Sequence, residues 1–401
     1  MRALLDAGID IDVFSFYPAQ LSLWRDVPHI LNKDILPPDR VHHVSLTGSL
    51  ASLRPWPARK FGRFLRDTSS ITVSALRFGA AALAKSVYVY PKAWTWAREH
   101  SNEYDHVLAY WGNYAGTCAY LFHRLLDRSI PFSTFLHAID LYQDQVYLRQ
   151  KLIYADNIIV VCNYNRHFLK EHFSGIYEAI KPKIYTYHLG LDLAEFPYEP
   201  NSRPKQKIVA VGSFETVKGF EYLLRAVYEL DRQGIEIEVE LIGEGELEQD
   251  LKTLARTLAI DRKILFRGWV PFDVVRAAMR KATILALPSL GDAVPTVIKE
   301  AMALGTPVIA SHVGGIPELL DNGRCGILVP PKDVNALAAG IKTLLHNEGV
   351  RKKYATEARQ HAEESFDLWR NGGQLASLLS STTRMERKKS PLLHASPLSE
   401  R

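Results

Sequence analysis

Cysteine is scarce in this 401-residue chain, which has three, at positions 118, 162 and 325. They lie far apart, and no Cys-x-x-Cys pair or histidine cluster at zinc-ligand spacing accompanies them. This excludes a disulfide scaffold and a structural zinc site. Free thiols are typical of a reducing compartment, and we therefore expect a cytoplasmic location.

Long uninterrupted apolar runs are also lacking. The most apolar long window, residues 71–90, contains Arg77 and Lys85, which makes it a poor membrane-spanning helix. Hydrophobic residues make up 47% of the chain and charged residues 23%, as in globular proteins. A length of 401 residues exceeds one ordinary core and predicts two domains.

Strong net charge is absent too, since the chain carries +5 at pH 7. Residues 41–66 nevertheless contain no acid, and Trp56, Phe61 and Phe64 alternate with basic residues there. The basic residues are Arg54, Arg59, Lys60, Arg63 and Arg66. Such a segment suits peripheral contact with an anionic membrane, on the inner face of the cell membrane, or equally a solvated basic face over a buried stripe. No stacking or groove-reading motif is present, so no nucleic-acid partner is expected.

Strand-like apolar runs alternate with helical patterns in both halves, which predicts an α/β fold with parallel sheets covered by helices. The runs in the first half are 9–16, 105–111, 131–138, 157–163 and 183–190. Those in the second half are 207–213, 237–245, 263–269, 283–289, 307–315 and a short one at 325–331.

A polar, proline-rich stretch at 195–207 predicts a linker between two Rossmann-like domains. We expect domains at 1–195 and 196–365, and a C-terminal helix at 366–381, packed toward the N-terminal domain, with a weak point at Gly372 and Gly373. The remaining residues, 382–401, have the composition of a disordered tail.

Three strand-to-helix turns of the second half carry the features of an anion site. Gly212 ends one strand, and Lys218 follows near the next helix start, where an ammonium can meet phosphate oxygens. Gly243 stands at a second turn and allows close backbone approach. The carboxyl ends of parallel strands and the helix starts beyond them are where such folds bind ligands.

The third turn, "GDAVPTVIKEAMALGTPVIAS", places acids on both sides of a helix start. Pro295 suits the first helical position, and the N–H groups of Thr296 and Val297 would be available to a diphosphate. Glu300, two turns along, can accept from the vicinal hydroxyls of a ribose, and Asp292 can reach a sugar beyond the phosphates. The pattern predicts a nucleotide-sugar site.

These motifs resemble those of family-4 retaining glycosyltransferases with the GT-B fold. The D-x7-E spacing from Asp292 to Glu300 is similar to the E-x7-E signature of that family, and "VGSFETVKGF", "LIGEGELEQ" and "ILFRGWV" continue the resemblance through the C-terminal half. "PFSTFLHAIDLYQD" resembles the exopolysaccharide and colanic-acid branch.

The resemblance implies two domains facing across a cleft and hexosyl transfer with retention, from a UDP-, GDP- or ADP-linked sugar to a glycan or lipid-linked acceptor. It implies that no cofactor and no metal is needed. His137 would act beside the donor sugar as a catalytic-site hydrogen-bond partner, together with Asp292. The implied donor-binding residues are Gly212, Ser213, Lys218, Gly243, Val270, Asp292, Ala293, Pro295, Thr296, Val297 and Glu300.

Two departures from the family pattern keep other functions open. Ser213 stands where relatives usually have arginine, and Asp292 shortens the first glutamate. A catalytically weak nucleotide-sugar-binding scaffold and a GT-B nucleotide-sugar epimerase are the alternatives. The start "MRALLDAGIDIDVF" resembles the end of the family's first helix and its second strand, so we expect an N-terminal domain without its first strand.

Overall fold

The computed structural model describes residues 1–16, 36–45, 48, 57–100, 103–126, 128–199 and 206–389. The chain divides into two compact units. The first contains residues 1–161, 165–187 and 372–401, and the second contains 162–164 and 188–371. The chain thus passes between units after Tyr187, ahead of the predicted boundary at residue 195. Part of the predicted linker, 200–205, lies outside the described residues.

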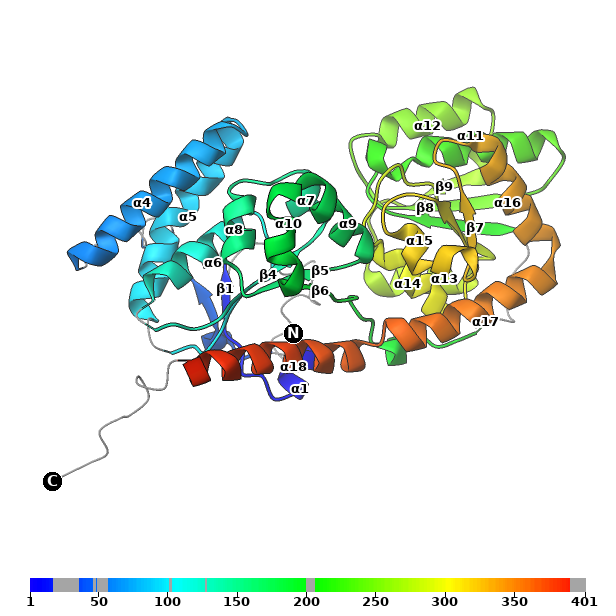
Figure 1. Ribbon diagram of the computed structural model, residues 1–401. Helices are drawn as coiled ribbons and strands as arrows, with labels where there is room; N and C mark the ends of the chain where they lie inside the picture. Colours follow the sequence, from blue (N-terminus) through cyan, green and yellow to red (C-terminus); the bar gives the residue numbers. More distant parts are fainter. Residues whose placement is uncertain are drawn as a thin grey trace. The chain divides into compact units, whose positions relative to one another are not determined.

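The first unit is built from short parallel strands and helices (Figure 1). Its strands are β1 (Val13–Ser15), β2 (Val41–His43), β3 (Val107–Ala109), β4 (Phe132–Leu136), β5 (Asn157–Val160) and β6 (Ile184–Thr186). Its helices are α1 (Arg2–Asp6), α4 (Ala58–Leu76), α5 (Ala80–Glu99), α6 (Tyr114–Leu125), α7 (Ala138–Tyr142), α8 (Leu148–Tyr154), most of α9 (Asn163–His172) and α10 (Ser174–Ile180).

The strands of the first unit form two separate parallel sheets. One pairs β1 with β2, and the other has the order β3–β4–β5–β6. Strand β2 was not predicted, because residues 41–43 are only half-buried and their two histidines hide the apolar signal of a strand. The alternation of strand and helix along the rest of the unit follows the predicted order.

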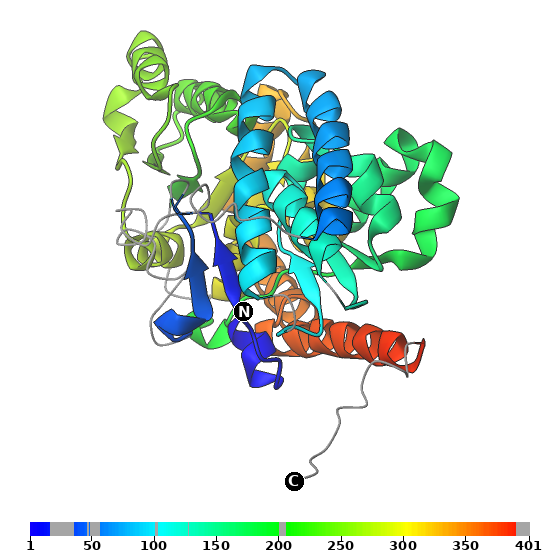
Figure 2. The same cartoon turned by 90° about the vertical axis from the view of Figure 1, so that its left-hand side faces the viewer.

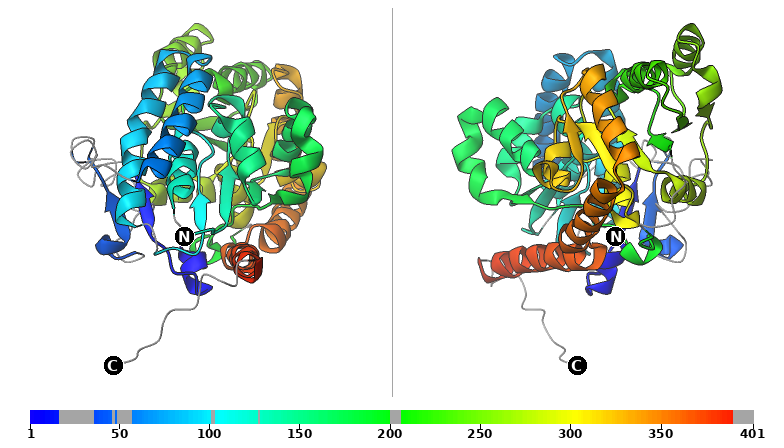
Figure 3. Two further views of the ribbon diagram at one scale, coloured as in Figure 1. Left: turned by 60° about the vertical axis from the view of Figure 1, so that its left-hand side comes forward. Right: turned by 90° about the vertical axis from the view of Figure 1, so that its right-hand side faces the viewer.

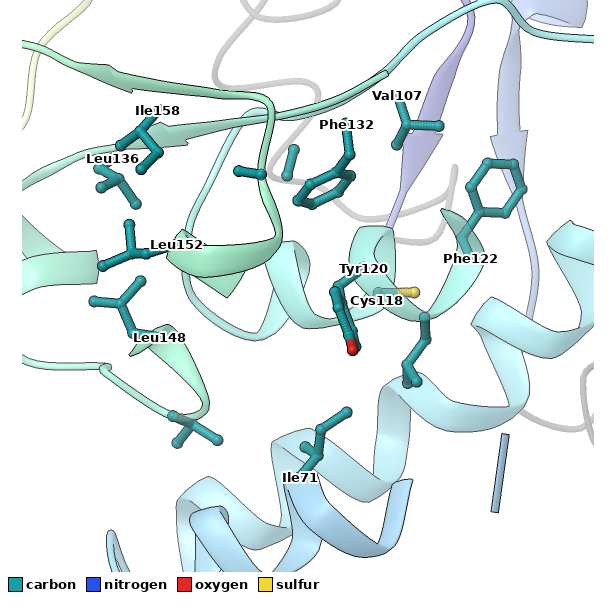
Figure 4. Packing of buried hydrophobic residues seen from close by; sticks show 14 of the residues in the cluster. Ile71, Val107, Cys118, Tyr120, Phe122, Phe132, Leu136, Leu148, Leu152 and Ile158 are labelled. Carbon is teal, nitrogen blue, oxygen red and sulfur yellow. The ribbon is translucent and has the colours of Figure 1, made fainter. Parts of the chain in front are cut away.

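A continuous apolar core fills the first unit (Figure 4). Strand β4 is buried at every position, so both of its faces are covered, as expected for a parallel strand between helical layers. Its Phe132 lies in the same cluster as Leu121 of α6, and Ile71 of α4 belongs to it as well. Burial of these side chains is the main favourable term for this unit.

Helices α4 and α5 form an antiparallel pair joined at Gly79, as Figures 2 and 3 show in blue and cyan. Only one side of α4 is buried, at Asp67, Thr68, Ile71 and Ala75. The opposite side faces away from the core. No helix within the described residues is long and apolar enough to cross a membrane.

The second unit is a single six-stranded parallel sheet of order β12–β11–β10–β7–β8–β9. The strands are β7 (Lys207–Val211), β8 (Glu238–Ile242), β9 (Ile264–Phe266), β10 (Ile284–Leu287), β11 (Val308–Ser311) and β12 (Ile327–Val329). The helices are α11 (Phe220–Arg232), α12 (Glu248–Thr257), α13 (Phe272–Lys281), α14 (Thr296–Leu304), α15 (Ile316–Leu319), α16 (Val334–His346) and α17 (Glu348–Ser365).

Helices cover both faces of this sheet. Successive residues of β7 point to opposite sides, so Ile208 joins the core under α11 and α16, whereas Val209 joins the core under α13, α14 and α17 (Figure 1). The predicted α/β architecture with parallel sheets is therefore confirmed, and the short strand expected at 325–331 is β12.

The C-terminal helix differs from its prediction. Helix α18 runs from Leu368 to Lys389, beyond the expected end at residue 381, and passes through Gly372 and Gly373 without a break. The interruption lies instead at Phe366 and Asp367, where Asp367 bridges to Leu191. Gly372 packs against Ala3 of α1, and a Cβ there would lie 2.3 Å from the Ala3 side chain. Close packing, which the sequence pattern does not reveal, explains this glycine. Residues 390–401 of the predicted tail lie outside the described residues.

Candidate active site

The predicted anion site lies at the carboxyl edge of the second unit's sheet, beyond β7, β8 and β10. There backbone hydrogen bonds join neighbouring turns. Gly212 N–H donates to Ile242 O and Gly243 N–H donates to Gly268 O, both at 3.0 Å. A Cβ on Gly243 would lie 2.0 Å from Gly212 O. Glycine is therefore required where the two turns approach one another.

Lys218 and Asp292 are brought together at this edge. Lys218 lies in the 3-10 turn Thr216–Lys218 before α11, and its side chain passes over Gly212. Its Nζ lies 2.6 Å from Asp292 Oδ2, and the two side chains are 22% and 15% exposed. Leu290 N–H donates to Val217 O at 2.7 Å and fixes the loop of Asp292 against that turn. The predicted phosphate cation and the predicted sugar-binding acid thus form an ion pair.

Helix α14 begins directly after the Asp292 loop. Pro295, predicted as the first helical residue, is instead the N-cap, and Thr296 is the first helical residue. The first N–H groups of a helix have no partner within it and carry its positive dipole end. The N–H groups of Thr296 and Val297 therefore point out of the start of α14, as an anion site requires.

Glu300 lies on α14 and is nearly buried, with 8% of its surface exposed. None of the described residues donates a hydrogen bond to its carboxylate. Burial raises the pKa of Glu300 to about 7, and the nearby charges of Lys299 and Arg276 lower it by less. A buried carboxylate without a hydrogen-bond donor costs folding free energy, which makes Glu300 a candidate for a functional rather than a stabilising group.

The neighbouring charges do not satisfy Glu300 because each has another partner. Lys299 is buried, and its Nζ donates to Leu189 O at 2.8 Å. Arg276 donates to Glu195 O at 2.7 Å and also pairs with Asp273. Both cations therefore act on Glu300 only at a distance.

The remaining predicted donor residues lie around these groups. Ala293 is buried, and its carbonyl oxygen contacts Gly315, where a Cβ would lie 1.9 Å away. Val270 is half-buried beside the core under α13. Ser213 directly follows Gly212 and is half-buried, so no second cation is supplied at that position.

His137, the predicted catalytic histidine, directly follows β4 in the first unit and is the N-cap of α7. Its ring Nε2 lies 3.1 Å from Tyr110 O, and the backbone N–H of His137 donates to Asp140 Oδ2 at 2.8 Å. Burial lowers the pKa of His137 to about 4, so the imidazole is neutral at physiological pH. The neighbouring Tyr142 hydroxyl donates to Asn165 Oδ1 at 2.6 Å.

A buried lysine that the sequence did not reveal supports this region. Lys151 Nζ donates to Gly112 O at 2.5 Å, Asn113 O at 3.1 Å and Thr117 Oγ1 at 3.0 Å. Asp140 Oδ1 accepts from Asn113 N–H at 2.9 Å, and its charge acts on the lysine. Two buried charges thus fix the loop after β3 and the residue before α7. Only the apolar flanks of Lys151 in α8 hint at its burial from sequence.

Comparison with known proteins assigns the second unit. The family described as "Glycosyl transferases group 1" matches residues 195–361. The chain carries a group 1 glycosyltransferase domain. Lys218, Asp292 and Glu300 all lie within the matched residues.

Curated relatives match about half of the chain. The chain is 31% identical over 206 residues to WcaL of Salmonella typhimurium, a glycosyltransferase assigned to colanic acid biosynthesis, covering 49% of this chain and 51% of WcaL. It is 31% identical over 205 residues to the amylovoran biosynthesis glycosyltransferase AmsK of Erwinia amylovora, covering 49% and 50%. The chain thus spans about half the length of the curated relatives it matches. The expected relation to exopolysaccharide glycosyltransferases is confirmed.

Solved structures extend the likeness to the whole chain at the level of the fold. Sucrose-phosphate synthase from Thermosynechococcus elongatus matches with a TM-score of 0.71 and 19% identity, covering 96% of this chain and 92% of that one. Anabaena HepE in complex with UDP and glucose matches with a TM-score of 0.59 and 22% identity, covering 74% and 81%. The predicted GT-B fold is confirmed.

Proposed function

We propose that the protein transfers a hexosyl group from a nucleoside diphosphate sugar to a glycan or lipid-linked acceptor. The observation that carries this proposal is Glu300, a nearly buried carboxylate without a donor among the described residues, on the helix whose N-terminus follows Asp292. Within the same family-matched segment, Lys218 supplies a cation. A nucleoside diphosphate sugar would satisfy the three groups together, because it carries ribose hydroxyls, a diphosphate and a hexose.

In this proposal each group has a separate task. Glu300 accepts hydrogen bonds from ribose hydroxyls, and Val270 contacts the base. Lys218 and the N–H groups that open α14 bind the diphosphate, and Asp292 and the backbone at Ala293 hold the hexose. Anabaena HepE, which shares the fold, was solved in complex with UDP and glucose, so UDP-glucose is the first donor to test.

The proposed reaction forms a bond between an acceptor hydroxyl oxygen and the anomeric carbon. The bond from that carbon to the phosphate oxygen breaks, its electron pair stays on the diphosphate, and the hydroxyl proton passes to that phosphate or to water. Cations and helix N–H groups stabilise the charge that develops on the leaving group. Retention of configuration is part of the proposal, and His137, neutral at physiological pH, hydrogen-bonds near the reacting sugar.

The exposed surface of α4 favours an acceptor that is linked to a lipid. Phe61, Leu65 and Val73 on this helix are 48%, 48% and 57% exposed. Arg59 and Arg66 are exposed on the same helix, and its single acid, Asp67, is buried against Arg124 at 2.8 Å. An apolar and cationic helix face fits an anionic bilayer, where a lipid-linked acceptor would be found.

Donor turnover by the purified chain tests the function. We expect slow hydrolysis of UDP-glucose with release of UDP, because water can take the place of the acceptor hydroxyl when no acceptor is present. A scaffold would bind the donor without releasing nucleotide, and an epimerase would convert one nucleotide-sugar into another with no free UDP. If no UDP-, GDP- or ADP-sugar is hydrolysed or transferred, the proposal is wrong.

A further inference from the structure

Two aromatic side chains are exposed in the loop that follows β3. Tyr110 is 49% exposed and Trp111 is 40% exposed. This loop leaves the carboxyl end of a parallel strand, which is the edge where α/β sheets bind ligands. Large rings that remain exposed at such an edge favour a binding role, because burial elsewhere would stabilise the fold more.

The ring of Trp111 lies against the proposed catalytic histidine. The Trp111 and His137 ring centroids are 4.2 Å apart at an interplanar angle of 33°. His137 also stacks with Phe135, at 5.2 Å and 17°. The imidazole of His137 therefore contacts both a buried phenyl ring and a partly exposed indole ring.

The loop is rigid before any ligand arrives. The carbonyl oxygens of Gly112 and Asn113 accept from buried Lys151, and Asn113 N–H donates to buried Asp140. A Cβ on Gly116 would lie 2.5 Å from Trp111 O, so the first turn of α6 is closely packed against the loop. Because the Trp111 ring is already held in place, it loses little conformational entropy on binding, so even a weak face-to-face contact can contribute to affinity.

We propose that Trp111 is the stacking platform for a pyranose ring of the acceptor, which makes the acceptor a saccharide-bearing molecule. One face of a pyranose presents C–H bonds, and the face of an indole carries the negative part of its quadrupole. This inference rests on the proposed glycosyl transfer and adds the chemical class of the group that receives the sugar. Polar-tipped aromatic rings beside an imidazole suit a hydroxyl-rich ring better than an alkyl chain.

Saturation-transfer NMR on the full chain tests the platform without requiring turnover. The probes are methyl β-D-glucopyranoside, methyl β-D-galactopyranoside and methyl α-D-mannopyranoside, with decyl phosphate as an alkyl probe. We expect ring-proton saturation of at least one glycoside with the parent, its loss in Trp111→Ala, and its partial retention in Trp111→Tyr. Trp369→Ala is the matched control, because Trp369 is 38% exposed in the second unit.

Steady-state kinetics distinguish a Trp111 that binds the acceptor from a Trp111 that only positions His137. With a binding glycoside as acceptor, the KM for that acceptor should rise about tenfold in Trp111→Ala, whereas the donor KM stays unchanged. A lower kcat with unchanged acceptor KM would overturn the platform and leave only a positioning role.

Three other outcomes would also overturn the platform. They are equal saturation of glycosides in Trp111→Ala and the parent, binding of no glycoside by the parent, and saturation of decyl phosphate alone. Failure of the transferase proposal is distinguishable, because the parent would then release no nucleotide while Trp111-dependent glycoside binding persisted.

Discussion

Lys218 Nζ and Asp292 Oδ2 lie 2.6 Å apart, so the cation proposed for the donor diphosphate is bound to the acid proposed for the donor sugar. A diphosphate that reaches Lys218 must compete with this carboxylate. In the proposed donor site, the pair would therefore influence the affinity for the product as well as for the substrate, since both carry the diphosphate. Removing either partner should change these two affinities in different ways.

Asp292→Asn should raise the affinity for UDP and lower sugar transfer. The change frees Lys218 from an ion pair worth about 1 kcal/mol, which corresponds to roughly fivefold tighter UDP binding. The amide loses the charged acceptor for the hexose hydroxyls, so affinity for UDP-glucose should rise less than affinity for UDP. Calorimetry with both ligands measures the ratio. Lys218→Gln is the matched variant and should weaken UDP binding by about 1.5–3 kcal/mol. Parallel losses in both variants would contradict the competition.

Glu300→Gln should make donor binding independent of pH. Because the pKa of Glu300 is raised to about 7, the carboxylate that accepts ribose hydroxyls forms as the pH rises through that value. The affinity of the parent for UDP-glucose should therefore increase by up to about tenfold from pH 6 to pH 8. The diphosphate of a nucleotide-sugar does not titrate in this range. A parent whose affinity stays flat, or a variant with the same slope, would remove Glu300 from the site.

The same substitution should stabilise the ligand-free protein at high pH. The pKa of Glu300 in the folded state lies above its ordinary value of 4.5, so the folded state binds the proton more tightly. Its favourable contribution is complete below pH 4.5 and is lost as the pH rises through about 7. Glu300→Gln should gain roughly 1–3 kcal/mol over the parent at pH 8 and little at pH 5. Thermal melts at pH 5 and pH 8 test this. An equal stability difference between variant and parent at both pH values would show that burial does not destabilise the ionised carboxylate.

Sequence patterns predicted the fold well where one residue type decides the outcome. Val, Ile and Leu runs located every strand of the second unit, because parallel strands covered by helices on both faces are mostly apolar, as the fully buried β10 and β11 are. Strand β2 escaped because His42 and His43 are half-buried and polar. Gly372 of α18 packs against Ala3, which is distant in sequence, and no local pattern encodes this contact.

The candidate site was predictable in its residue types but not in its pairings. The spacing of Asp292 and Glu300 predicted two acids around one helix start, and both lie there. It could not reveal that Asp292 binds Lys218, or that Glu300 has no donor among the described residues, because both facts depend on how separate strands meet at one edge. Lys151 and Trp111 were missed for the same reason.

His137→Ala should lower transfer strongly while UDP binding stays unchanged. A preorganised hydrogen-bonding group at the reacting centre is worth about 10²–10³ in kcat. Burial lowers the pKa of His137 to about 4, so the pH profile of kcat should show no titration of this residue between pH 6 and pH 9. Tyr142→Phe is a nearby control that removes only a hydroxyl bonded to Asn165. A loss of folding with activity per folded molecule intact would contradict a catalytic role.

Binding to anionic membranes should depend on the exposed face of α4. Leu65→Glu with Val73→Glu places two charges among side chains that are 48% and 57% exposed, without altering the core. Flotation with phosphatidylglycerol vesicles should recover the parent, and recovery should fall at least fivefold in this variant, because apolar insertion and attraction to anionic lipid are both lost. High salt should weaken recovery of the parent as it screens the arginines. Leu265→Glu with Val274→Glu is the matched control in the second unit, where the side chains are 51% and 38% exposed. Equal recovery with neutral vesicles, or an unchanged variant, would mean that α4 presents an ordinary solvated face.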